Sequence, residues 1–394
     1  MKISRCKPLE GIRVLDLTRL LPGPMCTLHL ADMGADVIKI EDTGDGDYAR
    51  KIGTRNADNS LFFLALNRNK RGVRLDLKQP RGREVFLKLT ERADLIVESF
   101  RPGVMDKLGI GYHAVSARSP RIVYCSISGY GQTGPYRDRA GHDINYLGYA
   151  GVLNDIGKES PIVPNYQIAD TLGGALTGAM GILAALLDAK TSGRGRYVDV
   201  SMTDSVLAHA LLALVTLKEG GEAPPRGESP LSGGLPWYNV YETSDRRYLA
   251  LGALEKKFWD KLCEALGRPD LKDRHGSAGE AAAALEREVA SIFRTQPLVY
   301  WTNKLVARDC CASPVLTLAE ALEDEQVKSR EMVVESSHPV DGKVTQFALP
   351  IKFSEFEFEV ARPAPMPGEH SEEVLREAGY TAQEIGALRD RGVI

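Results

Sequence analysis

Short apolar segments with the lengths of β-strands alternate with helical segments through the first third of the chain. Ile12–Leu17 and Asp36–Glu41 have strand patterns, and Met25–Gly34 between them has a helical pattern. The series continues with strands at Val73–Leu77, Leu95–Glu98 and Arg121–Ser126 and a helix at Arg81–Glu91. This alternation is typical of a parallel sheet, because each helix carries the chain back to the start of the next parallel strand. We therefore predict an α/β fold with a doubly wound parallel sheet.

The pattern changes after about Ser201. A predicted helix over Asp204–Leu217 leads into a turn-rich stretch, Gly220–Gly234, and no repeat follows. The later predicted elements are strands at Asn239–Glu242 and Tyr248–Gly252, helices at Lys256–Leu266 and Ala281–Thr295, a hairpin of Met332–Val334 and Val344–Phe347, and helices at His370–Glu377 and Thr381–Arg389. Because 394 residues exceed one compact core, we predict a large domain of residues 1–205 and 330–394 and a smaller α+β domain of residues 206–329.

One segment, Thr171–Leu187, is free of charge and near the short limit for a membrane-spanning helix. It contains Gly173, Gly174, Gly178 and Gly181, and small residues at these spacings let a helix pack closely against another backbone. We predict a helix buried in the protein and no membrane span.

The net charge and the cysteines indicate which partners and which cellular compartment to expect. The formal net charge of -3 gives no global attraction to nucleic acid, so we expect no nucleic-acid partner. The six cysteines form no C-x-x-C pair, and no secretory h-region precedes the first strand. We expect free, mostly buried thiols, Cys6 among them, and a cytoplasmic location.

The motifs for common cofactors are missing from the sequence. The turn after the first strand is LPGPMC rather than G-x-G-x-x-G, and neither G-x-S-x-G nor a Walker loop occurs. The histidines stand apart from one another and from the cysteines, so no metal site is predicted.

Three polar positions are candidates for chemistry. His142 and Asp143 follow the glycine-rich stretch that begins at Gly129, Asp170 stands at the head of the glycine-rich helix, and Glu255 opens a later helix. Each also has an ordinary structural explanation. Asp143 and Asp170 stand where helix N-caps stand, His142 suits a loop, and a glutamate is favoured in a first helical turn. Cations placed to meet phosphate are Lys78, Arg101 and Lys107.

At these residues the chain resembles the α-methylacyl-CoA racemases and their relatives, the family III CoA-transferases. The resemblance runs nearly end to end, through PLEGIRVLDLTRLLPGP, MGADVIKIE, NRNKRGVRLDLK, ADLIVESFRPGVMDKLGIGY, ISGYGQTGPY, GHDINY, TSGRGRYVDVSMTDS and YNVYET. It implies an interlocked homodimer with each active site between subunits. It also implies coenzyme A contacts at Leu75, Asp76, Leu77, Lys78, Ser99, Phe100, Arg101, Lys107, Gly141, Asp143, Ile144, Asn145 and Tyr146.

The racemase branch is favoured by two matches. GHDINY around His142 is the racemase form, and Gly252-Ala-Leu-Glu255 matches a racemase glutamate. The resemblance then implies that His142 and Asp170 transfer protons, with Glu255 assisting. The chain departs from the pattern at Asp42, where some racemases have an arginine for the nucleotide, and at Lys107, where arginine is common.

Three functions remain open at this point. A racemase or epimerase of 2-methylacyl-CoA thioesters, acting in lipid metabolism, needs a base on each face of the α-carbon. An imidazole, with a reference pKa of about 6.5, suits one of them. A CoA-transferase would use Asp170 as a nucleophile toward the thioester carbonyl and needs no second base. A non-catalytic acyl-CoA binder is the third. No cofactor is expected beyond the coenzyme A carried by the substrate.

Overall fold

The computed structural model describes residues 7–221 and 224–394, which form two compact units. The first unit comprises the described residues up to Val152 together with Asn165–Ala210 and Gln326–Ile394, and the second comprises Leu153–Pro164 and Leu211–Glu325. Residues 153–164, which the sequence analysis assigned to the large domain, thus group with the second unit. The domain assignment itself stays a prediction. Cys6 and residues 222–223 of the turn-rich stretch lie outside the described residues.

The first unit holds most of the secondary structure. Its elements are β1 (Arg13–Asp16), α1 (Pro22–Asp32), β2 (Asp36–Glu41), η1 (Tyr48–Lys51), α2 (Leu61–Asn67), β3 (Lys70–Arg74), α3 (Pro80–Thr90), β4 (Leu95–Glu98), α4 (Val104–Lys107), α5 (Tyr112–Arg118), β5 (Val123–Ser128), α6 (Asp143–Tyr149), η2 (Ala169–Leu176), α8 (Thr177–Ser192), β6 (Tyr197–Ser201), α9 (Met202–His209), β10 (Val333–His338), β11 (Gly342–Phe347), α16 (Ser371–Glu377) and α17 (Ala382–Asp390). The chain passes between the units four times: within α7 (Val152–Asp155), after Pro164, after Ala210 and within α15 (Glu325–Ser329).

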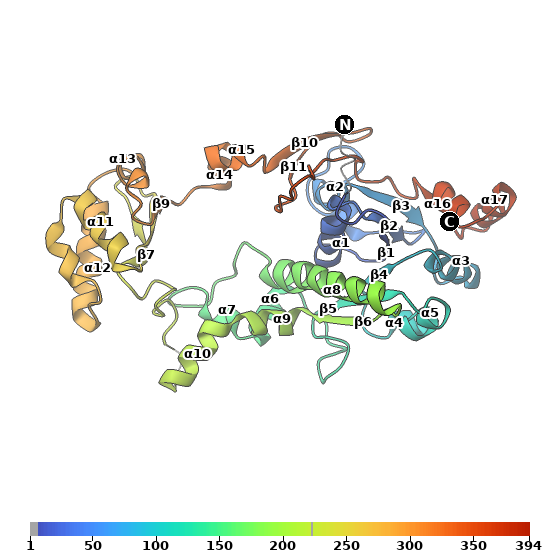
Figure 1. Cartoon of the computed structure of the whole chain (residues 1–394), viewed down its shortest axis with the longest axis horizontal. Coiled ribbons are helices and arrows are strands. Elements are labelled where there is room, and N and C mark those ends of the chain that lie inside the picture. The colour runs from blue at the N-terminus through green and yellow to red at the C-terminus, as the bar shows by residue number, and fades with distance from the viewer. Residues whose placement is uncertain (1–6, 222–223) are drawn as a thin grey trace. The chain divides into compact units, whose positions relative to one another are not determined.

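Six parallel strands form the central sheet in the order β3-β2-β1-β4-β5-β6 (Figure 1). The chain starts at β1, moves outward to β3, then returns to β4 on the other side of β1. This order places a change of direction between β1 and β4, which is where α/β sheets bind ligands, at the carboxyl ends of the strands. The predicted parallel sheet is confirmed. The LPGP segment follows β1, and its residues from Pro22 onward already form the first turn of α1, which begins three residues earlier than the predicted helix.

Helices cover both faces of this sheet. On one face α1 and α8 contact each other, and α8 lies against β5 and β6. The apolar core on the other face takes its side chains from the strands and from α3, α5, α16 and α17. The C-terminal helices therefore belong to the same core as the N-terminal strands. An example is the contact of α16 with β3, where Arg71 is paired with Glu373 at 2.8 Å and Glu377 at 2.7 Å.

Strand β3 lies three residues earlier than the predicted strand, at Lys70–Arg74 rather than Val73–Leu77. Its first residues are charged but buried, and each has a partner. Lys70 is paired with Asp16 at 3.1 Å, and Arg71 with Asp36 at 2.6 Å. Burial lowers the pKa of Lys70 to about 8 in spite of the nearby carboxylate.

Two further elements differ from the prediction. The edge strand β6, Tyr197–Ser201, was not predicted, because its outer side chains Tyr197 and Asp199 are exposed and interrupt an apolar pattern. The single predicted helix over Asp204–Leu217 is two helices, α9 and α10 (Leu211–Gly220). They are separated at Ala210, after which the chain enters the second unit.

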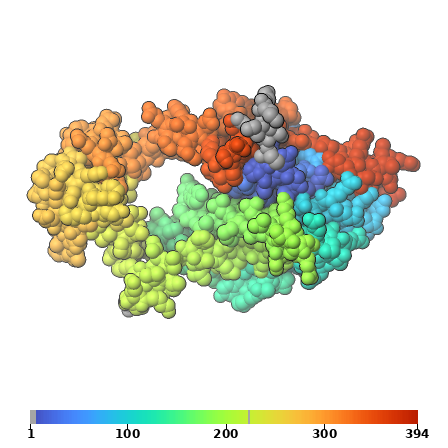
Figure 2. All heavy atoms as spheres, in the orientation of Figure 1, coloured from blue at the N-terminus to red at the C-terminus, as the bar shows by residue number. Residues whose placement is uncertain are grey.

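The glycine-rich apolar segment is helical, and only one of its faces is buried. Within the described residues, the run Ala169–Ser192 is the single helix with the length and apolar character to cross a membrane. It packs on the sheet, and a side chain at Gly174 would lie 2.5 Å from Pro22 Cβ, so glycine permits this close approach. The opposite face of α8 lies on the visible side of the molecule (bright green in Figure 2) and carries exposed leucines.

The second unit has its own core. An antiparallel sheet in the order β7-β8-β9 packs with helices around Trp259, whose indole N–H donates to the Leu271 carbonyl at 2.9 Å. Its elements are α10, β7 (Tyr238–Glu242), β8 (Tyr248–Gly252), α11 (Lys256–Leu266), η3 (Pro269–Arg274), α12 (Gly279–Phe293), α13 (Leu298–Leu305), η4 (Val306–Arg308), β9 (Ala312–Pro314) and α14 (Leu318–Glu323). The predicted strands and helices of residues 239–295 are all present here, with shifts of at most a few residues.

Candidate active site

Two adjoining cavities open at the carboxyl ends of the parallel strands. The first, here called the β3 cavity, has a volume of about 490 Å³ and is lined by the residues that follow β1, β2, β3 and β4. The second, the Asp170 cavity, has a volume of about 560 Å³ and lies on the β4 and β5 side. Arg19, Tyr48 and Phe100 line both cavities, so the two spaces share a wall. Their position is the one that the strand order favours for a ligand.

The Asp170 cavity brings together the two residues predicted to transfer protons. His142 and Asp170 both line it, together with Gly141 and Tyr146. His142 is exposed and immediately precedes α6, where its backbone N–H donates to Asn145 Oδ1 at 3.0 Å. The turn that carries the imidazole is therefore fixed by a local hydrogen bond, and the ring remains open to a ligand.

Asp170 lies in an unusual stretch of helix. The segment η2, Ala169–Leu176, has π-helical hydrogen bonding, and such wide turns occur frequently at functional sites. The Asp170 backbone N–H donates to Asp143 Oδ1 at 3.0 Å. Asp143, the first residue of α6, therefore joins the helix that carries His142 to the helix that carries Asp170.

The electrostatics of Asp170 differ from those of a surface carboxylate. Burial raises its pKa to about 7, and the negative charge of Asp143 adds to the increase. Both the neutral and the ionised forms of Asp170 are thus well populated near neutral pH. Asp143, predicted as a coenzyme A contact, is in the first unit the carboxylate that neighbours Asp170.

Tyr146 closes one side of the same cavity. Its hydroxyl donates to the Gly141 carbonyl at 2.6 Å, which ties α6 to the loop before it. A Cβ atom at Gly129 would lie 2.3 Å from the tyrosine ring, and one at Gly141 would lie 2.7 Å from it. The glycines of this loop are therefore required for the ring to pack where it does.

The predicted coenzyme A contacts divide into those that line a cavity and those that do not. Residues 75–78 line the β3 cavity, Ser99 and Arg101 line the Asp170 cavity, and Phe100 lines both. Lys107, Asp143, Ile144 and Asn145 line neither cavity. Lys107 is exposed at the end of α4, although its neighbour Leu108 lines the β3 cavity.

Glu255 lies in the second unit. It is exposed and immediately precedes α11, shortly after β8. Its predicted assistance to His142 and Asp170 stays a prediction.

Several residues that line the Asp170 cavity were not predicted. They include Arg19, Tyr130, Arg137, Arg139 and Met202. The signal that was available is topological, because residues just after parallel strands meet at one edge of the sheet. Arg19 follows β1 and Tyr130 follows β5, so both could have been nominated from the predicted strands alone. Arg137 and Arg139 belong to the loop that leads to His142.

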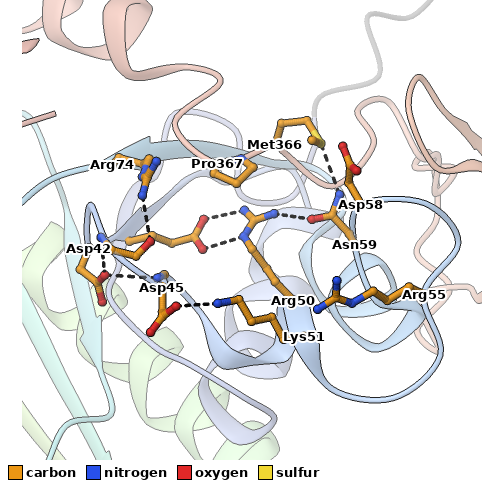
Figure 3. Close-up of a pocket in the computed structure, with 13 residues that line it drawn as sticks. Asp42, Asp45, Arg50, Lys51, Arg55, Asp58, Asn59, Arg74, Met366 and Pro367 are labelled. Carbon is orange, nitrogen blue, oxygen red and sulfur yellow. Dashed lines mark hydrogen bonds and ion pairs between the residues drawn. The ribbon is translucent and has the colours of Figure 1, made fainter.

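Asp42 lies at the far end of the β3 cavity and organises a loop. It accepts hydrogen bonds from Arg19 at 2.7 Å and from the Gly44 backbone N–H at 2.9 Å. It also lines a further cavity of about 370 Å³, shown in Figure 3. There Arg50 is held by Glu41 through two hydrogen bonds of 2.8 and 2.6 Å and by Asn59 at 2.7 Å. Arg50 is thus already occupied by partners within the protein.

Across residues 7–221 and 224–394, no group of three or more His, Cys, Asp or Glu side chains is arranged to hold a metal ion.

Comparisons with known proteins agree with the fold. The model of the family described as CoA-transferase family III matches residues 9–371. The chain is 34% identical to an α-methylacyl-CoA racemase from Homo sapiens, over 98% of this chain and 97% of the relative. It is 32% identical to a succinyl-CoA:glutarate CoA-transferase from Mus musculus, over 98% of this chain and 90% of the relative.

A solved structure extends the likeness to three dimensions. The crystal structure of a CAIB/BAIF family protein from Brucella suis is similar, with a TM-score of 0.82 and 28% identity, over 94% of this chain and 99% of that one. The family match spans nearly the whole sheet-containing unit and the second unit. The chain belongs to CoA-transferase family III.

Proposed function

We propose that this enzyme inverts the α-carbon of 2-methylacyl-CoA thioesters by proton transfer between His142 and Asp170. The observation that carries the proposal is that both residues line one cavity, in which the pKa of Asp170 is raised to about 7. Inversion removes a proton from one face of the α-carbon and delivers a proton to the other face. It therefore needs two groups that exchange protons near neutral pH, one protonated while the other is not.

The reaction proceeds through an enolate. The thioester carbonyl acidifies the adjacent C–H, so one group takes the proton and the carbonyl oxygen becomes negative. Arg137 and Arg139 line the same cavity and supply positive charge for the thioester oxygen or for the coenzyme A phosphates. The second group then returns a proton to the opposite face, and an assisting role for Glu255 is part of the proposal. No cofactor beyond the coenzyme A of the substrate takes part in these steps.

The coenzyme A portion is proposed to lie along both cavities. The residues that follow β3 and β4 line them, including Lys78 and Arg101, and the shared wall at Phe100 lets one long ligand occupy both spaces. Arg101 makes no hydrogen bond or ion pair through its side chain with any described residue, which leaves the guanidinium available for a phosphate.

The second candidate is CoA transfer, and the similarity to a succinyl-CoA:glutarate CoA-transferase favours it. Asp170 would attack the thioester carbonyl and release the CoA thiolate, forming a mixed anhydride. The thiolate would then attack the Asp170 carbonyl, releasing the acid and leaving an enzyme-bound thioester. This role requires an ionised Asp170, and a pKa of about 7 leaves much of it protonated at neutral pH. The proton-transfer role uses both forms, so we place the racemase first.

We further propose that the enzyme is a cytoplasmic homodimer. The outer face of the η2–α8 helix exposes Leu176, Met180, Leu183 and Leu187, and the residues recur at helical spacing. Their exposed fractions are 50%, 64%, 37% and 67%. A continuous apolar helix face of this kind marks an interaction surface, and a second copy of the chain would cover it. Free cysteines, four of them buried in the described part of the chain, suit a reducing compartment.

One experiment separates the two reactions. The enzyme is incubated in heavy water with a 2-methylacyl-CoA and an isotopically labelled free acid, and both products are followed by mass spectrometry. Deuterium uptake at the α-carbon without movement of CoA to the labelled acid is the expected result. Movement of CoA without deuterium uptake would establish the transferase instead. If neither deuterium uptake nor movement of CoA is seen with several acyl groups, the remaining function is a non-catalytic acyl-CoA-binding protein.

A further inference from the structure

A third cavity lies on the far side of Arg101 and Arg137 from the Asp170 cavity. We call it the β5 cavity, and its volume is about 210 Å³. Arg101 and Arg137 line both spaces. The remaining lining residues are Glu98, Gly103, Met105, Asp106, Gly111, Tyr112, His113, Tyr124, Ser126, Gln132 and Tyr197. The reaction proposed above uses none of these remaining residues.

The register of three parallel strands builds the polar wall of the β5 cavity. Glu98 of β4 lies beside Ser126 of β5, and Ser126 lies beside Asp199 of β6. The Phe100 backbone N–H donates to Glu98 at 2.8 Å, and the Tyr197 hydroxyl donates to Ser126 Oγ at 3.1 Å. The wall is therefore fixed by hydrogen bonds within the sheet.

Three other polar atoms of this cavity are buried without a partner. They are Tyr124 Oη, Gln132 Nε2 and Arg137 Nε, and no described residue accepts or donates a hydrogen bond to them. Tyr124 is only 1% exposed, so its hydroxyl cannot be satisfied at the outer surface of the protein. Buried polar groups are almost always hydrogen-bonded, and three unpaired donors around one cavity indicate a ligand that accepts hydrogen bonds.

The charges that line the β5 cavity indicate which class of ligand it could bind. The Arg137 guanidinium forms no ion pair with the residues that the structure describes, and its own Nε is one of the three unpaired donors. Burial raises the pKa of Glu98 to about 7, against the effect of its Ser126 and Phe100 partners. The facing carboxyl group is thus partly neutral at physiological pH. Two arginines without an ion pair to any described residue, Arg101 and Arg137, outweigh the carboxylate of Asp106 in this small cavity, and together with the uncharged donors they suit a compact monoanionic head group.

We propose that the β5 cavity binds the carboxylate of a free short-chain carboxylic acid, held by Arg137, Gln132 and Tyr124. An arginine and neutral N–H and O–H donors are the partners that a planar carboxylate takes. The volume admits an acid of a few carbon atoms and excludes a long acyl chain. This site goes beyond the reaction proposed above and stands whether that reaction proves to be inversion or transfer.

Calorimetric titration of acetate and of succinate into the full-length protein, without acyl-CoA, tests the site. Saturable binding to the wild type is expected. Arg137→Gln should weaken it by about tenfold or more, because a charge-assisted contact is lost. The matched control is Arg118→Gln on the exposed end of α5, which should bind like the wild type. The proposal is overturned if the wild type shows no heat of binding, or if Arg137→Gln binds the acids with the same affinity as the wild type.

Tyr124→Phe provides a second readout that a purely structural tyrosine would not give. It removes only the unpaired hydroxyl, so the melting temperature of the ligand-free protein should stay the same or rise. Acid binding should weaken several-fold at the same time. A lower melting temperature with unchanged binding would show that the hydroxyl serves folding and would refute its role in the site.

The pH dependence provides a third check. Binding should weaken between pH 6 and pH 8 as Glu98 ionises and repels the anion, and Glu98→Gln should remove most of that change. The other charged or titratable groups around it are Arg101, Asp106, Tyr112, His113, Tyr124, Arg137, Tyr197 and, next in the strand row, Asp199. An arm with succinyl-CoA and butyryl-CoA tests the source. If Arg137→Gln weakens succinyl-CoA alone and free succinate not at all, the assignment to a free acid is wrong.

Discussion

The Asp143 carboxylate lies 3.0 Å from the Asp170 backbone nitrogen and accepts its hydrogen bond. One carboxylate thereby holds the backbone of another, and its charge contributes to the raised pKa of Asp170. The two aspartates occupy the first turns of different helices, α6 and η2, so the contact also sets where His142 stands relative to Asp170.

The first prediction concerns Asp143→Asn. The amide keeps an oxygen that can accept the Asp170 N–H but removes the negative charge. Ionisation of Asp170 then becomes easier, so its pKa falls below about 7. In a pH profile of α-proton exchange, the limb due to Asp170 should move to lower pH. Asp138→Asn, at an exposed loop position, is the control and should leave the profile in place.

The second prediction concerns the proton-transfer pair. His142→Ala and Asp170→Asn should each reduce inversion by about a hundredfold or more, because general acid–base groups contribute that much. Each variant should retain slow deuterium exchange on the face served by the remaining group. A transferase would behave differently: His142→Ala would be mild, while Asp170→Asn would abolish movement of CoA between acids.

The third prediction separates cations that line a cavity from cations that do not. Arg101→Ala should weaken acyl-CoA binding by about tenfold with little change in melting temperature, since its side chain is exposed and makes no contact that folding needs. Lys107→Ala, at the neighbouring exposed position that lines neither cavity, should have a smaller effect. Equal losses in both variants, measured by calorimetry, would contradict the cavity assignment.

The fourth prediction concerns the buried pair of Glu41 and Arg50. Their side chains are 3% and 7% exposed, and they meet at 2.6 Å. Arg50→Ala leaves Glu41 buried without its partner, which should cost about 3–5 kcal/mol of unfolding free energy. The midpoint of chemical denaturation of the first unit measures it. Lys51→Ala breaks the neighbouring exposed pair with Asp45 and should leave the midpoint almost unchanged.

The fifth prediction tests the proposed dimer. Leu187→Glu places a charge in the exposed apolar face of α8 and should convert the dimer to monomer in sedimentation experiments. Arg118→Glu, at an exposed position on the separate helix α5, is the control and should leave the assembly intact. A wild type that sediments as a monomer at all concentrations would refute the dimer.

The sequence was sufficient where local pattern decides structure. Strands β2 and β4 and helix α11 begin and end where the apolar periodicity indicates. It failed at β3, since Lys70 and Arg71 look like surface residues until their carboxylate partners are known. Those partners are as distant in the chain as Glu377, and no local pattern shows them.

The site shows the same division. His142 and Asp170 were nominated by residue type and by the resemblance, and they line one cavity. The β5 cavity was not nominated, because it depends on which residue of β4 lies beside which residue of β5 and β6. That register is a property of the assembled sheet. A sequence pattern gives the faces of a strand but not its exact neighbours.

The π-helical turn at Ala169–Leu176 separates two demands on one helix. An α-helix advances by about 100° per residue, so one additional residue in a turn rotates everything before it relative to everything after it. Here Asp170 lies at the start of the wide turn and lines the cavity, while the exposed leucines of α8 follow the turn and face outward. The wide turn therefore sets the angle between the direction of the Asp170 carboxylate and the direction of the apolar face that is proposed to form the dimer. Deleting one residue within it should leave both halves helical yet turn the Asp170 carboxylate away from the cavity.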